Sequence, residues 1–156
     1  MGYEIERKYL VKDKTILEGK QGILYRQAYI ETANNNVVRL RTVDKKAYIT
    51  LKGQNEGLVR LEYEYEIPLE DANEIIENLC QKPPIEKMRY IIPYKGFEWV
   101  IDQFMGQNHG LIMAEIELPN KDTEFSKPPF IGAEVTNDTR YYNSNLVKNP
   151  YANWNN

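Results

Sequence analysis

Residues 60–67 read Arg60-Leu61-Glu62-Tyr63-Glu64-Tyr65-Glu66-Ile67, with a charged side chain at nearly every second position. Because successive side chains of a β-strand point to opposite faces, this stretch puts its charges on one face and its apolar groups on the other. A half-buried strand commonly alternates in this way, with its polar face toward solvent. The meaning of the pattern therefore depends on whether other segments repeat it.

The same alternation recurs along the chain. Eight segments have the length and content of strands, and seven of them carry charges at alternate positions. Turn-forming stretches such as Asn34-Asn35-Asn36 and Gly53-Gln54-Asn55-Glu56-Gly57 separate several of them and favour antiparallel neighbours. A sheet of eight strands tends to close into a barrel. The segments are residues 3–11, 23–31, 37–43, 46–53, 59–67, 86–93, 97–104 and 112–118.

One clear helix interrupts the strands. It is predicted over residues 69–80, where apolar residues recur at spacings of three and four. Cys80 is expected to be a small core residue beside this stripe. Weaker helices are expected over residues 14–19 and, after Asn137, over Arg140 to Lys148. The stripe consists of Leu69, Ala72, Ile75, Ile76 and Leu79.

Length and composition exclude several classes of protein. The 156 residues predict one domain over residues 1–156, with residues 149–156 as a polar tail. A net charge of −3 argues against a dedicated nucleic-acid binder, and no stretch approaches the ~18 apolar residues of a membrane span. A single cysteine excludes an internal disulfide framework or a multi-cysteine zinc site, so a cytoplasmic location is expected.

The alternation allows two barrels, one with an apolar interior and one whose charged faces line the lumen. Like charges placed side by side are unfavourable unless something neutralises them. Here the charges are segregated by strand, so we predict a charged lumen with the helices packed outside. The fold class is therefore α+β, a closed antiparallel eight-stranded barrel. The acids are Glu4, Glu6, Glu62, Glu64, Asp102, Glu115 and Glu117, and the bases are Lys8, Arg39, Arg41, Lys52, Arg60, Lys87 and Arg89.

These charged rows indicate a metal–polyphosphate site. Paired carboxylates on adjacent strands supply the oxygen ligands that Mg²⁺ or Mn²⁺ prefers. Arginine forks match phosphate oxygens, and lysines add point charges. Gln27 and Tyr29 share a face of their strand, and either line the lumen or are ordinary strand residues. The single histidine, His109, is expected in an exposed loop.

The segment Glu4-Ile5-Glu6-Arg7-Lys8 resembles the Glu-x-Glu-x-Lys signature of the CYTH superfamily, the triphosphate tunnel metalloenzymes. Later features follow in the order typical of that family, and the resemblance spans about residues 3–147. The closing stretch from Glu134 to Asn143 is similar to that of short bacterial members. The later features are Arg39-Leu-Arg41, Thr50-Leu-Lys52, Arg60-Leu-Glu62-Tyr-Glu64, Lys87-Met-Arg89, Asp102 and Glu115-Ile-Glu117.

The resemblance implies an enzyme that hydrolyses a terminal phosphoanhydride with Mg²⁺ or Mn²⁺, most simply tripolyphosphate to pyrophosphate and phosphate. By matching positions, the metal ligands are Glu4, Glu6, Glu115 and Glu117. Catalytic roles fall to Lys8, Glu62, Glu64 and Asp102. The triphosphate cradle would consist of Lys8, Arg39, Arg41, Lys52, Lys87 and Arg89, with Arg60 either binding phosphate or pairing with a glutamate.

Other functions stay open on the sequence alone. A nucleoside triphosphatase, a thiamine triphosphatase or an adenylate cyclase could use the same fold, although no obvious pocket for a base or a thiamine ring is present. A polyphosphate-binding module without turnover would not need the acidic residues. The expected partner is a small triphosphate, with no nucleic acid or membrane, and a homodimer is left open.

Overall fold

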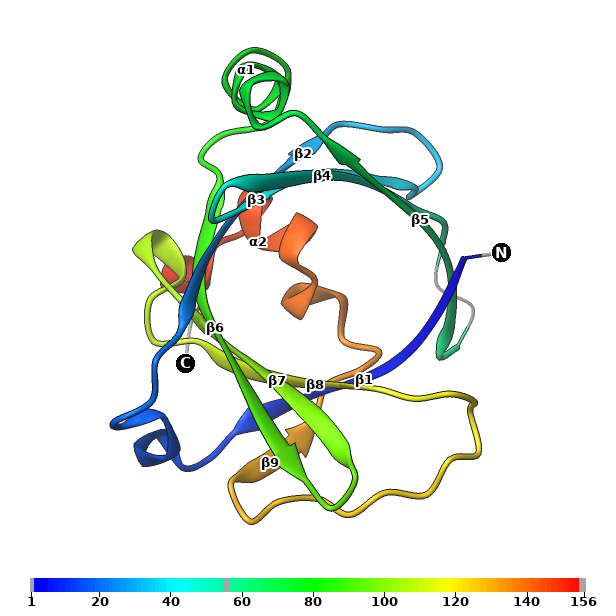
Figure 1. Ribbon diagram of the computed structural model, residues 1–156, viewed down its shortest axis with the longest axis vertical. Helices are drawn as coiled ribbons and strands as arrows, with labels where there is room; N and C mark the ends of the chain where they lie inside the picture. Colours follow the sequence, from blue (N-terminus) through cyan, green and yellow to red (C-terminus); the bar gives the residue numbers. More distant parts are fainter. Residues whose placement is uncertain (1, 55–56, 155–156) are drawn as a thin grey trace.

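The computed structural model describes residues 2–54 and 57–154. Met1, the Asn55–Glu56 part of a predicted turn and the last two residues of the predicted tail lie outside this range. Eight antiparallel strands close a barrel, and each agrees with its predicted range to within one residue at either end (Figure 1). The strands are β1 (Tyr3–Val11), β2 (Ile23–Ile30), β3 (Val37–Val43), β4 (Lys46–Lys52), β5 (Val59–Ile67), β6 (Ile85–Tyr94), β7 (Phe97–Phe104) and β8 (Ile112–Glu117).

Strand β1 closes the barrel. Its first residues pair with β5, and its later residues pair with β8. The β1–β5 contact is close, because a Cβ atom on Gly2 would lie 1.5 Å from the backbone oxygen of Glu62. A glycine is therefore required at this point of closure. A ninth strand, β9 (Ile131–Glu134), pairs with the C-terminal end of β1, at Tyr9 and Val11, and was not predicted.

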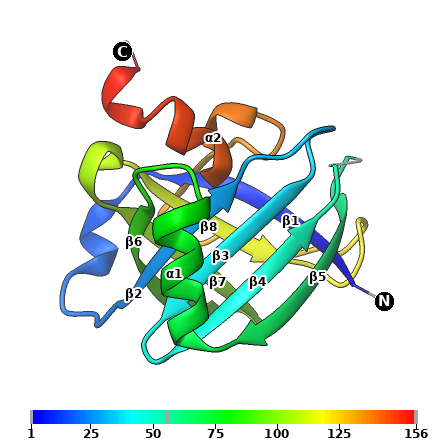
Figure 2. The ribbon, with the colours of Figure 1, turned by 90° about the horizontal axis from the view of Figure 1, so that it is seen from above.

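Helix α1 (Leu69–Leu79) confirms the predicted helix and packs on the outside of the barrel, across β3 and β4 (Figure 2). Its Ile76 joins Ala28 and Leu40 in a buried cluster, and Cys80 packs at the edge of that cluster. The last member of the predicted stripe, Leu79, is 64% exposed, so its side chain does not join the buried cluster.

A larger apolar core covers the outer surface of β1, β7 and β8. Tyr9, Trp99 and Ile101 are almost fully buried there. The ring of Trp99 meets those of Tyr9 and Phe125 edge to face, at centroid distances of 5.6 and 5.9 Å. Apolar side chains of β1 and β7 thus point outward, which leaves the alternate positions of these strands to face the barrel interior.

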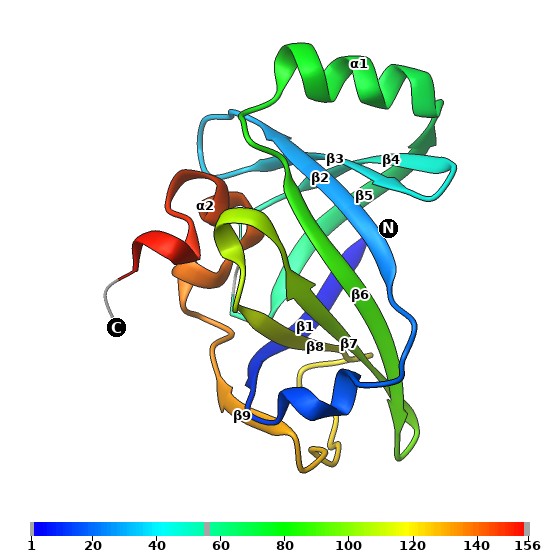
Figure 3. The ribbon, with the colours of Figure 1, turned by 90° about the vertical axis from the view of Figure 1, so that its left-hand side faces the viewer.

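The C-terminal segment lies across one opening of the barrel. Its helix α2 (Asn143–Lys148) follows a short 3₁₀ turn at Thr139–Tyr141, within the region predicted to be helical. Viewed along the barrel, α2 projects over the opening, so the prediction of helices outside the wall holds for α1 and not for α2 (Figures 1 and 3). The predicted helix at residues 14–19 is a 3₁₀ turn, Lys14–Leu17.

The predicted tail is anchored by its aromatic residues. The ring of Trp154 lies 5.1 Å from those of both Tyr141 and Tyr151, and the backbone N–H of Tyr151 donates to Oδ1 of Asn108 at 2.8 Å. In residues 2–54 and 57–154, no helix is long and apolar enough to cross a membrane.

Candidate active site

A polar cavity lies inside the barrel and encloses about 440 Å³, part of it open to solvent. Gln27 and Tyr29 line it, which settles their orientation. Residues 142–144, just before and at the start of α2, form part of its wall. Nine of the predicted site residues also line it: Glu6, Lys8, Arg39, Arg41, Lys52, Arg60, Lys87, Arg89 and Glu115.

The described lining of this cavity has an excess of positive charge, with seven cationic side chains and two carboxylates. The pKa of Arg41 is lowered to about 10 by burial and by the charges of Arg39 and Arg89. Burial also lowers the pKa of Lys87 to about 7, although Asp102 opposes the shift. Because proximity of like charges is unfavourable, the cavity suits a multiply charged anion.

One buried arginine atom is left without a partner in this cavity. Within the described part of the chain, Nε of Arg39 makes no hydrogen bond, while Nη2 donates to Thr50 and Glu64, each at 3.2 Å. An unsatisfied buried donor is costly, and an acceptor oxygen in the cavity would remove that cost.

Asp102 does not line the cavity and lies behind it. It is 2% exposed and accepts from Lys87 Nζ at 2.8 Å and from Arg89 Nε and Nη2 at 2.8 and 2.9 Å. Although burial raises the pKa of Asp102, these two cations hold it well below its usual range. Its carboxylate therefore fixes the positions of two cations that face the cavity.

Acidic side chains gather where β1 meets β8 and β5. The register places Glu6 opposite Glu117 and Lys8 opposite Glu115. Burial, followed by the charges of Glu115 and Glu4, raises the pKa of Glu6 to about 8. The pKa of Glu115 is held at about 2, because Lys8 and other cations outweigh the effect of burial.

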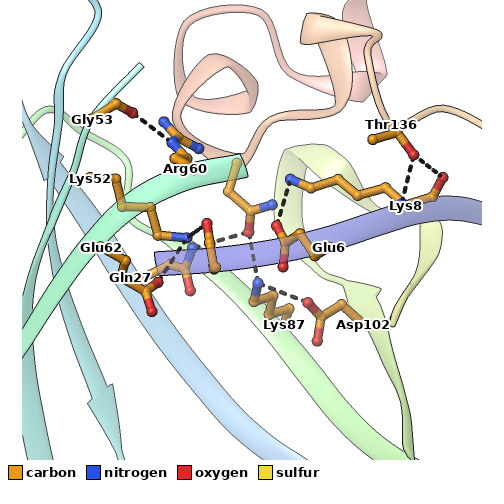
Figure 4. A network of polar contacts seen from close by, with 12 residues as sticks. Glu6, Lys8, Gln27, Lys52, Gly53, Arg60, Glu62, Lys87, Asp102 and Thr136 are labelled. Atoms are coloured by element: carbon orange, nitrogen blue, oxygen red, sulfur yellow. Dashed lines mark hydrogen bonds and ion pairs between the residues drawn. The ribbon is translucent and has the colours of Figure 1, made fainter. Parts of the chain in front are cut away.

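Lys52, the last residue of β4, lies between two carboxylates near the place where β1 meets β5 (Figure 4). Its Nζ lies 2.9 Å from Glu4 Oε1 and 3.3 Å from Glu62 Oε2. Arg60 is fixed nearby, since its Nε donates to the backbone oxygen of Gly53 at 2.7 Å. Glu4 is buried, while Glu62 is partly exposed, so the three charges mark the transition from the cavity to solvent.

The carboxylates supply the oxygen donors that suit a hard cation, and two of them have raised pKa values. The pKa values of Glu6 and Glu117 are both raised, each by burial and by neighbouring carboxylates, which a divalent cation would counter. Among the described residues, no group of three acidic, histidine or cysteine side chains converges closely enough to hold a metal ion. Glu4 is instead paired with Lys52.

The sequence did not identify the contribution of the C-terminal segment. The ring of Tyr142 lies under Lys8 Nζ at 4.8 Å and under the Arg60 guanidinium at 6.0 Å. Asn143 Oδ1 accepts from Lys87 Nζ at 2.7 Å. The family resemblance covers Tyr142 and Asn143 but assigns them no role, and they follow a turn and not an alternating strand. His109 is exposed on a loop, as predicted.

Comparisons with known proteins agree with this arrangement. The family model described as the CYTH domain matches residues 2–150. The chain is 53% identical over 154 residues to an inorganic triphosphatase of Acetivibrio thermocellus, covering 99% of each chain. It is 35% identical over 150 residues to an inorganic triphosphatase of Nitrosomonas europaea, covering 92% of this chain and 96% of the relative.

A solved structure shows the same fold at a comparable level of identity. The crystal structure of the inorganic triphosphatase NE1496 gives a TM-score of 0.66 and 31% identity, covering 94% of this chain and 95% of that one. Sequence and structure thus relate this chain to the same kind of protein over nearly its full length.

Proposed function

The chain belongs to the CYTH domain family, and from that premise we propose that it is an inorganic triphosphatase that converts tripolyphosphate to pyrophosphate and phosphate. The single observation that carries the choice of substrate is the cavity, where seven cationic side chains face two carboxylates. Arg39 is one of these cations, and its buried Nε has no hydrogen-bond partner among the described residues. We propose that the cradle comprises Lys8, Arg39, Arg41, Lys52, Arg60, Lys87 and Arg89.

We propose that Glu4, Glu6, Glu115 and Glu117 hold Mg²⁺ or Mn²⁺. Their oxygen donors suit these ions, and the raised pKa values of Glu6 and Glu117 support a cation between them. A bound cation supplies Lewis-acid polarisation of a phosphoryl oxygen. With a cation held by these carboxylates, Glu4 would contact it in place of Lys52, and Lys52, still 3.3 Å from Glu62, would be available to phosphate.

The protein's own residues then align the reaction. Phosphoryl transfer depends mainly on positioning and on charge stabilisation. Lys87 and Arg89, fixed by Asp102, hold the substrate and stabilise the leaving pyrophosphate. We assign Asp102 to positioning because it lies behind both cations.

We propose that Glu62 or Glu64 accepts the proton of the attacking water. The oxygen of that water bonds to the terminal phosphorus as the phosphorus–oxygen bond to the leaving pyrophosphate breaks. Both carboxylates lie beside proposed phosphate-binding cations, Lys52 at 3.3 Å and Arg39 at 3.2 Å. Their partial exposure gives the proton a route to solvent.

Phosphate release is the direct test. With Mg²⁺ or Mn²⁺, we expect turnover of tripolyphosphate to exceed that of ATP or thiamine triphosphate, because the cavity offers charge contacts for phosphates. EDTA should reduce the rate to background. Faster turnover of ATP would favour a nucleoside triphosphatase, and accumulation of cyclic AMP would favour a cyclase. Binding of tripolyphosphate without release of phosphate would indicate a binding module.

We propose a second copy of this chain as a partner. An uncharged patch on the outer faces of β1, β4 and β5 leaves its large side chains 41–58% exposed. An aromatic side chain has roughly 200 Å² of surface, and the three tyrosines are about half exposed, so together they offer about 300 Å². This is a substantial part of the ~800 Å² that each partner buries in a standard interface. The patch consists of Tyr3, Leu51, Leu61, Tyr63 and Tyr65.

Sedimentation or light scattering tests this partner. The wild type is expected at about twice the chain mass of 18.3 kDa, and Tyr63→Asp at the chain mass, because a charge at the centre of the patch, beside Leu51, must lose its hydration on association. Ile91→Asp, an exposed position on β6, is the matched control and should remain dimeric. A monomeric wild type would contradict the proposal.

Two further expectations from the sequence, a single domain over residues 1–156 and a cytoplasmic location, stay predictions.

A further inference from the structure

Asn143 places an amide oxygen against a buried lysine of the cavity. Its Oδ1 accepts two hydrogen bonds, from Lys87 Nζ at 2.7 Å and from Gln27 Nε2 at 3.0 Å. Lys87 and Gln27 are each 1% exposed. Bulk water therefore does not reach either donor. Loss of the Asn143 oxygen would leave two buried N–H groups without a hydrogen-bond acceptor, which costs free energy.

Gln27 extends the network to a second cation. Its Oε1 accepts from Arg41 Nε and Nη2 at 3.2 and 3.0 Å, while its Nε2 donates to Asn143 and, at 2.6 Å, to Tyr29 Oη. Arg41 therefore donates to Gln27, and Gln27 in turn donates to Asn143. The orientation of the Gln27 amide is therefore fixed by both neighbours.

Lys87 is held from two sides. Asp102 of β7 lies 2.8 Å from its Nζ, and Asn143 approaches the same atom from the C-terminal segment. Figure 4 shows Lys87 between Gln27 and Asp102. Asp102 alone leaves the ammonium free to turn about that contact, whereas a second acceptor restricts its direction.

We propose that Asn143 is a positioning residue for the triphosphate, which aligns Lys87 directly and Arg41 through Gln27. This inference rests on the proposed function, because it assumes that these two cations bind phosphate. The C-terminal segment then contributes to substrate affinity in addition to covering one opening of the barrel. An alternative is that Asn143 only anchors this segment to the barrel.

The two roles differ in their effect on anion affinity. Tripolyphosphate binding is measured by calorimetry in EDTA, so that neither metal nor turnover contributes. Asn143→Ala should weaken binding about tenfold, because Lys87 and Gln27 both lose the acceptor that fixes their direction. In a Lys87→Met background the same change should weaken binding less than about threefold, because its direct effect on Lys87 is gone and only the indirect effect on Arg41, through Gln27, remains.

Controls separate folding from alignment. Asn78→Ala removes an amide that donates to the backbone oxygen of Glu74 on the exposed side of α1, and should bind as the wild type does. If Asn143→Ala unfolds, Asn143→Ser takes its place, since serine is well tolerated at helix starts. Wild-type affinity in the folded variant, or an equal loss in both backgrounds, would overturn the inference.

The outcome is independent of catalysis. A wild type that binds tripolyphosphate without hydrolysing it contradicts the proposed function, while the affinity cycle still tests Asn143. A wild type that does not bind tripolyphosphate overturns both.

Discussion

Glu6→Gln is expected to lower the rate of tripolyphosphate hydrolysis by at least about 100-fold while the fold stays intact. The amide removes the negative charge that a divalent cation needs from this ligand. The fold should tolerate the change, because burial and the charges of Glu115 and Glu4 raise the pKa of Glu6 to about 8, so its carboxyl is largely neutral near pH 7 without metal. Initial rates with Mn²⁺, calorimetric Mn²⁺ affinity and thermal midpoints measure the two effects.

A matched change outside the barrel provides the control. Glu70→Gln removes a carboxylate from the exposed first turn of α1 and should retain wild-type rates and Mn²⁺ affinity. If Glu6→Gln also kept both, the assignment of Glu6 as a metal ligand would be wrong. A large fall in its thermal midpoint would instead show that the charge supports the fold.

Asp102→Asn should cost about 3–5 kcal/mol of unfolding free energy, because it leaves the buried charges of Lys87 and Arg89 without their carboxylate. In the wild type the folded pKa of Asp102 is depressed by these cations. Its contribution is therefore present above the ordinary aspartate pKa and is lost as the pH falls below that value. Urea unfolding at neutral pH measures the difference.

Tripolyphosphate provides a second readout for Asp102→Asn. In EDTA, the anion should stabilise the variant more than the wild type, since it restores negative charge beside two cations. Asp122→Asn, on an exposed loop, should stay within about 0.5 kcal/mol of the wild type. If Asp102→Asn also stayed within that margin, the buried ion pairs would contribute little to the fold.

The strict alternation of charge explains why the barrel could be predicted from the sequence. Period-two patterning fixes which side chains share a face, and the segregation of acids and bases distinguishes an inward charged face from an outward one. Helix α1 was also predictable from periodicity, because its apolar residues recur at spacings of three and four. β9 was missed, since Ile131–Glu134 has only four residues and no alternating charge.

Side-chain pairings were harder to predict than strand faces. The sequence groups Glu4 with the other acids, whereas the structure pairs it with Lys52, at the end of β4. A buried carboxylate pairs with a nearby positive charge, and periodicity does not reveal which one. Asn143 was missed because its contacts with Gln27 and Lys87 span 116 and 56 positions of the chain.

The position of β1 determines when the active site can form during synthesis. Glu6 pairs with Glu117, and Val11 pairs with Ile131, so residues from the start of the chain wait for partners more than a hundred positions later. At roughly 5–20 residues per second, that delay is on the order of ten seconds on the ribosome. A nascent chain therefore cannot enclose a phosphate until its last strands have emerged, and until then the apolar face of β1 depends on chaperones or on transient contacts for protection.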